Sequence, residues 1–163
     1  TLIDAFARLA PFFPDWDLRI VGDGELRADL EARITVAGLT ARVSMPGSVR
    51  DIPQEYLRAQ LLVLPSRYEG FGLVVAEALA HGLPVVGFAD CDGIGSLISS
   101  GQNGILVQPA ANRAGALSEE LRKLMVSSAA REDLARQCEM PAGFETRQVV
   151  EAWEHLIETV VTV

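Results

Sequence analysis

Short apolar runs alternate with helical stretches along the whole chain, and this alternation constrains the fold more than any other feature. Each run is followed by a turn and then by a segment whose apolar residues recur at helical spacing. Such chains form a parallel sheet covered by helices on both faces. We therefore expect an α/β fold, a three-layer α/β/α Rossmann-like domain with a parallel sheet, over residues 1–163. The expected strands are 18–21, 43–45, 61–64, 84–87 and 104–107, and the expected helices are 2–9, 25–36, 52–59, 72–81, 94–99, 112–125, 131–138 and 145–160.

Two segments are apolar at almost every position. The run 61–64 reads LLVL, which is typical of a strand buried on both faces. The helix 72–81 carries LVVA and ALA around a single charge, Glu77, and an all-round apolar helix is expected to be buried. A helix that begins at residue 2 with no strand before it suggests that the sequence starts partway through its first strand–helix unit.

Composition excludes several classes of protein. The chain has 163 residues, enough for one domain with its own core, and 49% of them are hydrophobic, which excludes a disordered chain. A net charge of −8 argues against nucleic acid as a partner, because phosphates require a basic face. Two cysteines, Cys91 and Cys138, are too few for a disulfide scaffold and favour a reduced compartment. No transmembrane segment or signal peptide is expected, and the location predicted is cytoplasmic.

The segment from Pro65 to Glu77, PSRYEGFGLVVAE, carries most of the chemical information. It follows the predicted strand 61–64 and opens the next helix. Gly70 and Gly72 leave backbone N–H groups uncovered at the start of that helix. A helix N-terminus has unpaired donors and partial positive charge, so it favours an anion such as phosphate.

Two glutamates bracket this helix start. A buried, unpaired carboxylate costs several kcal/mol, so Glu77 is expected to be neutral, paired or directed into a polar cleft. There it could hydrogen-bond ligand hydroxyls such as a ribose diol, while Glu69 could hold another part of the same ligand. A nucleotide sugar fits both requirements. The competing interpretations are a solvated loop residue for Glu69 and a partly exposed helix residue for Glu77.

Other motifs are weaker. Gly22 and Gly24 follow a predicted strand like the start of a dinucleotide-binding fingerprint, but Arg27 occupies the position of the third glycine, so an ordinary turn is the simpler interpretation. Backbone at Gly47 and Val49 could pair with a base edge, although an ordinary loop also explains it. No cluster of His, Cys or Asp has metal-ligand spacing, and no nucleophile elbow is present, so neither a metal site nor a Ser-His-Asp triad is expected.

Taken together, these motifs resemble the C-terminal domain of the retaining GT-B glycosyltransferases, the "group 1" family. The resemblance covers nearly the whole chain. Two glutamates separated by seven residues, with Gly-Phe-Gly between them, are the family's most specific motif, and Glu69 and Glu77 occupy those places. The segments that carry the resemblance are 20–24 (IVGDG), 63–80 (VLPSRYEGFGLVVAEALA), 82–86 (GLPVV) and 101–107 (GQNGILV), together with Gly47.

The resemblance implies a role for each matching residue. Glu69 would be the catalytic residue beside the donor sugar, and Glu77 would bind the ribose hydroxyls. Glycosyl transfer would then proceed with retention of configuration and without a metal or other cofactor, mainly through electrostatic stabilisation of the leaving diphosphate. The other donor-binding positions implied are Gly70, Phe71, Gly72 and Leu73 at the sugar and diphosphate, Gly47 and Val49 near the nucleobase, and Gly22 and Gly24 at the neighbouring strand edge.

The sequence also departs from the family. Family members have a strand and a basic loop before the helix that begins here at residue 2, and an acceptor-binding N-terminal domain. Neither is expected within this chain, so the chain alone is predicted to be inactive. Gly95 and Ser96 stand where the family usually has Pro-Glu. The last helix, 145–160, resembles one that packs on the missing domain, and its apolar face is expected to be available for self-association.

The sequence thus predicts the donor-binding domain of a retaining glycosyltransferase. The transferred group would be a hexose or N-acetylhexosamine, UDP being the family's commonest carrier, with GDP and ADP as alternatives. The acceptor would be a glycan or a lipid-linked glycan, reached through the missing domain at the cytoplasmic membrane face. The alternatives are a binding-only nucleotide-sugar module, a flavodoxin-like regulatory domain, which lacks its acidic pair here, and a GT-B epimerase, which lacks the Glu-Gly-Phe-Gly run.

Overall fold

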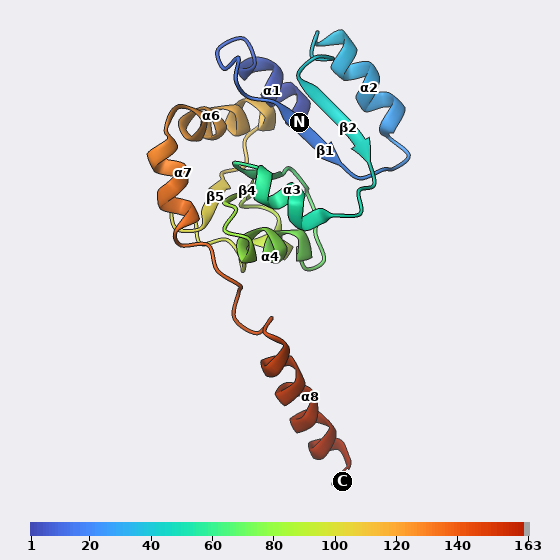
Figure 1. The fold of residues 1–163 in the computed structure, drawn as a ribbon, viewed down its shortest axis with the longest axis vertical. Helices are drawn as coiled ribbons and strands as arrows, with labels where there is room; N and C mark the ends of the chain where they lie inside the picture. The colour runs from blue at the N-terminus through green and yellow to red at the C-terminus, as the bar shows by residue number, and fades with distance from the viewer. Residues whose placement is uncertain (162–163) are drawn as a thin grey trace.

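The computed structural model describes residues 1–161 as an α/β domain with one helix standing away from it (Figure 1). The strands are β1 (Leu18–Val21), β2 (Val43–Gly47), β3 (Leu62–Leu64), β4 (Val85–Phe88) and β5 (Gly104–Val107). The helices are α1 (Leu2–Leu9), α2 (Arg27–Val36), α3 (Ile52–Arg58), α4 (Leu73–Ala80), α5 (Asp92–Gly95), α6 (Arg113–Val126), α7 (Ser128–Ala135) and α8 (Thr146–Val161). The predicted alternation of strands and helices is confirmed.

All strand pairs in the described residues are parallel, as predicted, but they form two sheets instead of one. β1 pairs with β2, and β3, β4 and β5 pair in that order. No pairing joins β1 to β3 within residues 1–161. The predicted α/β fold class with parallel strands is therefore confirmed, and the strands divide into a two-stranded and a three-stranded sheet within the described residues.

Helices cover both faces of the sheet layer and enclose two apolar cores. Alternate residues of β4 show this most directly: Val86 and Phe88 pack in one core, and Val85 packs in the other. The first core is built mainly with α1, α6 and α7, and the second with α3, α4 and α5. Since successive side chains of a strand point to opposite faces, the two cores define a three-layer α/β/α arrangement.

β3 differs from its predicted environment. The apolar run 61–64 was expected to be buried on both faces, yet each of its residues is half-buried. β4, which has strands on both sides, is buried at every position. The expectation is wrong for β3 because one edge of this strand faces a cavity instead of a neighbouring strand.

α4, α6 and α8 begin one residue later than predicted, and three other helices begin two or three residues away from the predicted position. α2 begins at Arg27 because its N–H closes a turn onto the carbonyl of Gly24. α7 begins three residues early because the Ser127 hydroxyl caps it by accepting from the N–H of Ala130. α5 is a single turn, Asp92–Gly95, so it begins two residues before the predicted range 94–99 and ends four residues before the end of that range.

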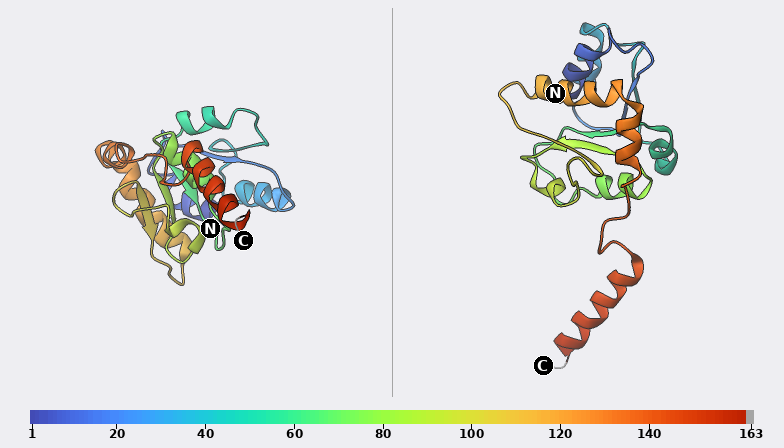
Figure 2. Two further views of the ribbon diagram at one scale, coloured as in Figure 1. Left: turned by 90° about the horizontal axis from the view of Figure 1, so that it is seen from below. Right: turned by 90° about the vertical axis from the view of Figure 1, so that its left-hand side faces the viewer.

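α8 projects away from the rest of the molecule in Figure 1 and in the right-hand view of Figure 2. None of its described residues is buried, and its large apolar side chains are exposed, Trp153 and Ile157 by more than half. The predicted apolar face is therefore present, whereas self-association through it stays a prediction. Within residues 1–161 no helix is long and apolar enough to cross a membrane.

Candidate functional site

The start of α4 leaves its first backbone donors free. The N-cap is Gly72, which has no side chain, and no side chain caps the helix in its place. The first N–H groups that bond back to Gly72 are those of Val75 and Ala76. Side chains cap α3, α6 and α7, whereas α1, α2 and α5 share with α4 the absence of a side-chain cap. The N–H groups of Leu73 and Val74 are therefore available to an anion, as the sequence predicted.

The backbone around Gly72 is fixed by a close approach to the turn at α5. Gly72 has a φ of +66°, a left-handed conformation that favours glycine. A side-chain carbon at this position would lie 2.9 Å from Cγ2 of Ile94 and 3.0 Å from the carbonyl oxygen of Gly93. Gly93 in turn lies against the backbone of Glu69, where a side chain would overlap the Glu69 carbonyl. The loop 69–72 is therefore held in place by packing rather than by hydrogen bonds alone.

Glu69 is half-buried in this loop. The hydroxyl of Ser66 donates to its Oε1 at 2.6 Å, which orients the carboxylate. The interpretation of Glu69 as a freely solvated loop residue is therefore not supported. Its other oxygen, Oε2, remains available to a ligand as an acceptor, since a carboxylate offers several lone pairs.

Glu77 is exposed, not buried, and it is partnered. α4 is apolar in composition, but Leu73, Glu77 and Ala80 form an exposed stripe along it. The expectation that the whole helix is buried is therefore wrong, because α4 lies at the surface of the layer. The phenol of Tyr56 on α3 donates to Oε2 of Glu77 at 2.8 Å. Burial, together with the Glu77 carboxylate, raises the pKa of Tyr56, so the phenol keeps its proton and remains a donor.

Two exposed apolar side chains flank the free donors. Phe71, in the loop before α4, is 57% exposed, and Leu73, the first residue of α4, is 60% exposed. The ring of Phe71 stacks on Phe144, with 5.2 Å between the ring centroids. Gly70 is exposed and has open space around its α-carbon. This side of the helix start thus combines polar donors with an uncovered apolar surface.

A second cluster lies at the ends of β1 and β2. The N–H of Gly22 donates to the carbonyl of Gly47, and both glycines have positive φ. Gly24 bonds to the carboxylate of Asp23, and Val49 is half-buried beyond the end of β2. Arg27, which stands in place of a third glycine, donates to the carbonyl of Met45 at 2.6 Å. The structure therefore joins Gly22 to Gly47, but within residues 1–161 no hydrogen bond or ion pair joins this cluster to Glu69 or Glu77.

Sequence reasoning missed three residues of the region. Tyr56 lies 21 positions from the glutamate that it contacts, and only the packing of α3 on α4 brings them together. Asp90 and Arg113 meet beyond the end of β4, where Arg113 donates to Asp90 at 2.6 Å. The Arg113 guanidinium lowers the pKa of the Asp90 carboxyl. An isolated Tyr, Asp or Arg in a sequence gives no signal of such a pairing.

Metal-ligating and reactive groups are not gathered in the part of the chain that the structure describes. No group of three or more His, Cys, Asp or Glu side chains that could hold a metal ion occurs within residues 1–161. The two cysteines are free, and burial raises the pKa of both thiols, that of Cys138 to about 11. His81 lies against the Tyr56 ring and the Glu77 carbonyl on α4.

Comparisons with known proteins place the chain in a family. The model of the family described as "Glycosyl transferases group 1" matches residues 1–139. An exopolysaccharide phosphotransferase of Streptomyces coelicolor is 35% identical over 162 residues, which cover 98% of this chain and 17% of that protein. The alpha-D-kanosaminyltransferase of Streptomyces kanamyceticus is 36% identical over 135 residues, which cover 82% of this chain and 34% of that protein.

Solved structures are similar over almost the whole chain. The Anabaena protein HepE, determined in complex with UDP and glucose, matches with a TM-score of 0.82 and 27% identity over 99% of this chain and 44% of its own. The GtfA/B complex matches with a TM-score of 0.85 and 28% identity over 98% of this chain and 32% of that chain. The fold is that of the C-terminal half of a GT-B glycosyltransferase. The chain belongs to the glycosyl transferases group 1 family and spans less than half the length of these relatives.

Proposed function

We propose that this chain is the donor-binding domain of a retaining glycosyltransferase, comprising residues 1–163. The single observation that carries the proposal is the uncapped start of α4, with free donors at Leu73 and Val74 between the carboxylates of Glu69 and Glu77. Membership of the family and the UDP complex of HepE, a structural relative, support the same assignment.

The roles of the residues follow from their chemistry. The N–H groups of Leu73 and Val74 bind a diphosphate oxygen, where the helix terminus favours negative charge. Glu77 accepts from the ribose hydroxyls on the exposed side of α4, and Glu69 accepts from hydroxyls of the donor sugar. Gly70 and Phe71 contribute backbone and ring surface to the sugar and diphosphate. Gly47 and Val49 border the nucleobase, and Gly22 and Gly24 lie at the neighbouring strand edge.

In the reaction, the bond between the sugar anomeric carbon and the diphosphate oxygen breaks. A bond forms from the acceptor hydroxyl oxygen to that carbon, and the hydroxyl proton passes to an oxygen of the departing diphosphate. The configuration at the anomeric carbon is retained. Stabilisation of the departing diphosphate by the α4 donors contributes electrostatically to the transition state, and no metal is required. The acceptor, a glycan or a lipid-linked glycan, is bound by an N-terminal domain.

The donor is a hexose or an N-acetylhexosamine carried by UDP. The test is calorimetric titration of UDP, GDP and ADP into the natural protein that contains these residues, as wild type and as Glu77→Ala. We expect one nucleotide to bind, with an affinity about 10–100-fold weaker in the variant, since charge-assisted hydrogen bonds contribute about 1.5–3 kcal/mol. Glu132→Ala on the exposed surface of α7 is the matched control and should bind like the wild type.

Glu69→Gln separates transfer from binding. It should leave nucleotide affinity unchanged and lower turnover of the intact enzyme, because its carboxylate faces the sugar and not the nucleotide. Equal nucleotide affinity in the wild type and Glu77→Ala would contradict the ribose role. Tight nucleotide-sugar binding without any transfer would instead indicate a binding-only module.

A further inference from the structure

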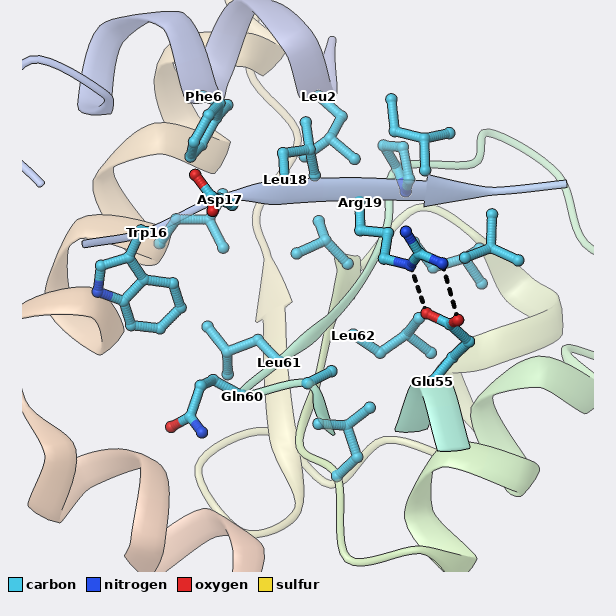
Figure 3. Close-up of a pocket in the computed structure, with 18 of the residues that line it drawn as sticks. Leu2, Phe6, Trp16, Asp17, Leu18, Arg19, Glu55, Gln60, Leu61 and Leu62 are labelled. Carbon is cyan, nitrogen blue, oxygen red and sulfur yellow. Dashed lines mark hydrogen bonds and ion pairs between the residues drawn. The ribbon is translucent and has the colours of Figure 1, made fainter. Parts of the chain in front are cut away.

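Two sets of contacts hold α4 and the loop before it, and both leave out Phe71. On one side, Arg19 of β1 forms an ion pair with Glu55 of α3 beside the cavity between β1 and β3 (Figure 3). The next residue of α3, a tyrosine, donates its phenol to Glu77 of α4. On the other side, the turn at α5 packs against Gly72. These contacts fix the helix and its N-cap, but not the residue that precedes the N-cap.

Phe71 is held instead by an aromatic ring from a distant part of the sequence. Its ring stacks on that of Phe144, in the linker between α7 and α8, with 5.2 Å between the ring centroids and 22° between the ring planes. Such aromatic pairs attract beyond the area that they bury. Phe71 stands between Gly70 and Gly72, and Gly70 has open space around its α-carbon. Because glycine restrains the backbone little, the side chain of Phe71 is the handle by which residues 70–72 are held.

Phe144 is a firm support because its surroundings fix it. The half-buried ring packs against the second core, as does Cys138 at the other end of the linker. The N–H of Phe144 donates to the carbonyl of Pro141 at 3.3 Å. Just before it, the N–H of Gly143 donates to Oε1 of Gln148 in the first turn of α8 at 2.8 Å. The ring is therefore tied both to the core and to the start of α8.

We propose that Phe144 is a positioning residue for the donor site. Its ring holds Phe71 in place and thereby orders the backbone that leads into the free N–H groups of Leu73 and Val74. A loop that is ordered before its ligand arrives loses less conformational freedom on binding, so the ligand binds more tightly. The inference rests on the proposed function, since it assigns a second residue to diphosphate binding at the start of α4. It also connects the start of α8 to that site.

The first test is limited proteolysis with chymotrypsin on the natural protein that contains these residues, without nucleotide. Cleavage after Phe71 requires local opening of the loop, so its rate follows the opened population when opening is fast. Phe144→Leu keeps an apolar side chain against the second core and removes the ring. We expect cleavage after Phe71 to become about 3–10-fold faster, the factor that corresponds to loss of an aromatic pair. Cleavage after Phe12, which is 77% exposed, is the internal control and should not change.

The second test is calorimetric titration of UDP, GDP and ADP into the same variants. Phe144→Leu should weaken the affinity for the nucleotide that binds by about 3–10-fold. Phe144→Tyr keeps the ring and should restore both the affinity and the slow cleavage after Phe71. Met140→Ala, on a 46% exposed residue of the same linker, is the matched control and should behave like the wild type in both tests.

Unchanged cleavage after Phe71 in Phe144→Leu would overturn the proposal. Equal acceleration after Phe71 and Phe12 would also overturn it, because the ring would then act only on overall stability. Faster cleavage after Phe71 with unchanged nucleotide affinity would overturn the positioning role. Proteolysis needs no nucleotide, so it decides on the ring contact by itself, whereas a wild-type protein that binds none of the three nucleotides would contradict the proposed function.

Discussion

β3 and β4 are neighbouring strands of nearly the same apolar composition, yet they occupy different environments. β4 is paired on both sides and buried at all of its positions, with Phe88 completely inaccessible. β3 is paired on one side, and every residue of it is half-buried. The difference shows that an apolar sequence does not by itself determine how deeply a strand is buried. Burial also depends on whether the strand is paired on one side or on both.

The largest expected effect of a single substitution is on the enclosed strand. Phe88→Ala should destabilise the fold by about 3–5 kcal/mol, because it removes a fully buried ring and leaves a cavity. It also removes the surface on which the Arg113 guanidinium lies, 3.7 Å from the ring centroid. Denaturant unfolding measures the change. Phe12→Ala is the matched control, since Phe12 is 77% exposed and its loss should change stability by less than about 0.5 kcal/mol.

A matched pair of valines tests the comparison directly. In this chain Val86→Ala should cost about 2 kcal/mol, whereas Val63→Ala should cost less than half as much, because Val63 is half-buried. Equal costs in the chain that begins at Thr1 would contradict the distinction between the two strands.

The loop after β3 provides the next contrast. Gly72→Ala should destabilise by about 1–2 kcal/mol, because an L-residue is strained at the left-handed conformation and its Cβ meets Ile94. Gly70→Ala has open space and should be nearly neutral. Thermal unfolding of the two variants measures the difference. A Gly70 variant as unstable as the Gly72 variant would show that the loop is not held by the α5 turn.

Tyr56 should act on binding through Glu77 more than on stability. Tyr56→Phe keeps the buried ring and removes the hydrogen bond to Glu77, so we expect about fivefold weaker nucleotide affinity, equivalent to about 1 kcal/mol, with little change in unfolding temperature. Tyr68→Phe, on an exposed ring 12 positions along, is the control. A fall in unfolding temperature without a change in affinity would assign Tyr56 a purely structural role.

The smallest expected effect is that of Asp90→Asn, in the loop after β4, on stability and its dependence on pH. The bond from Arg113 lowers the pKa of Asp90 in the folded protein, so the stabilisation is complete above the unfolded-state pKa near 3.8 and is lost as the pH falls through the lower folded value. Asp90→Asn should therefore reduce stability at neutral pH slightly and should flatten the fall in stability below about pH 4. Asp29→Asn, on an exposed residue of α2, should leave the acid limb unchanged.

Most of the fold could be predicted from the sequence because it depends on local periodicity. The strands at 18–21 and 104–107 and the helix at 2–9 were predicted to the residue. Caps and turns moved other boundaries: the Ser127 side chain begins α7 early, and the Gly24 turn delays α2. The order in which the strands pair could not be predicted, since hydropathy marks where strands lie and not which strands hydrogen-bond to one another.

The candidate site also has one part that the sequence predicts and another that depends on how the helices pack. The glycines and glutamates of residues 69–77 share one loop and helix, so their proximity follows from sequence alone. The exposure of Glu77 and its bond to Tyr56 depend on where α4 lies and on how α3 packs against it. The roles of Gly22, Gly24, Gly47 and Val49 in donor binding stay predictions, because only the pairing of Gly22 with Gly47 is formed in the structure.

Amide exchange at the start of α4, measured with and without UDP, is the direct test of diphosphate binding by the first N–H groups of this helix. We expect UDP to slow exchange of the N–H groups of Leu73 and Val74 in the natural protein, since these donors are free at the uncapped helix start and would bind the diphosphate. Glu77→Ala should weaken that protection at a fixed UDP concentration. UDP binding that protects another part of the chain and leaves exchange at Leu73 and Val74 unchanged would contradict diphosphate binding at the start of α4.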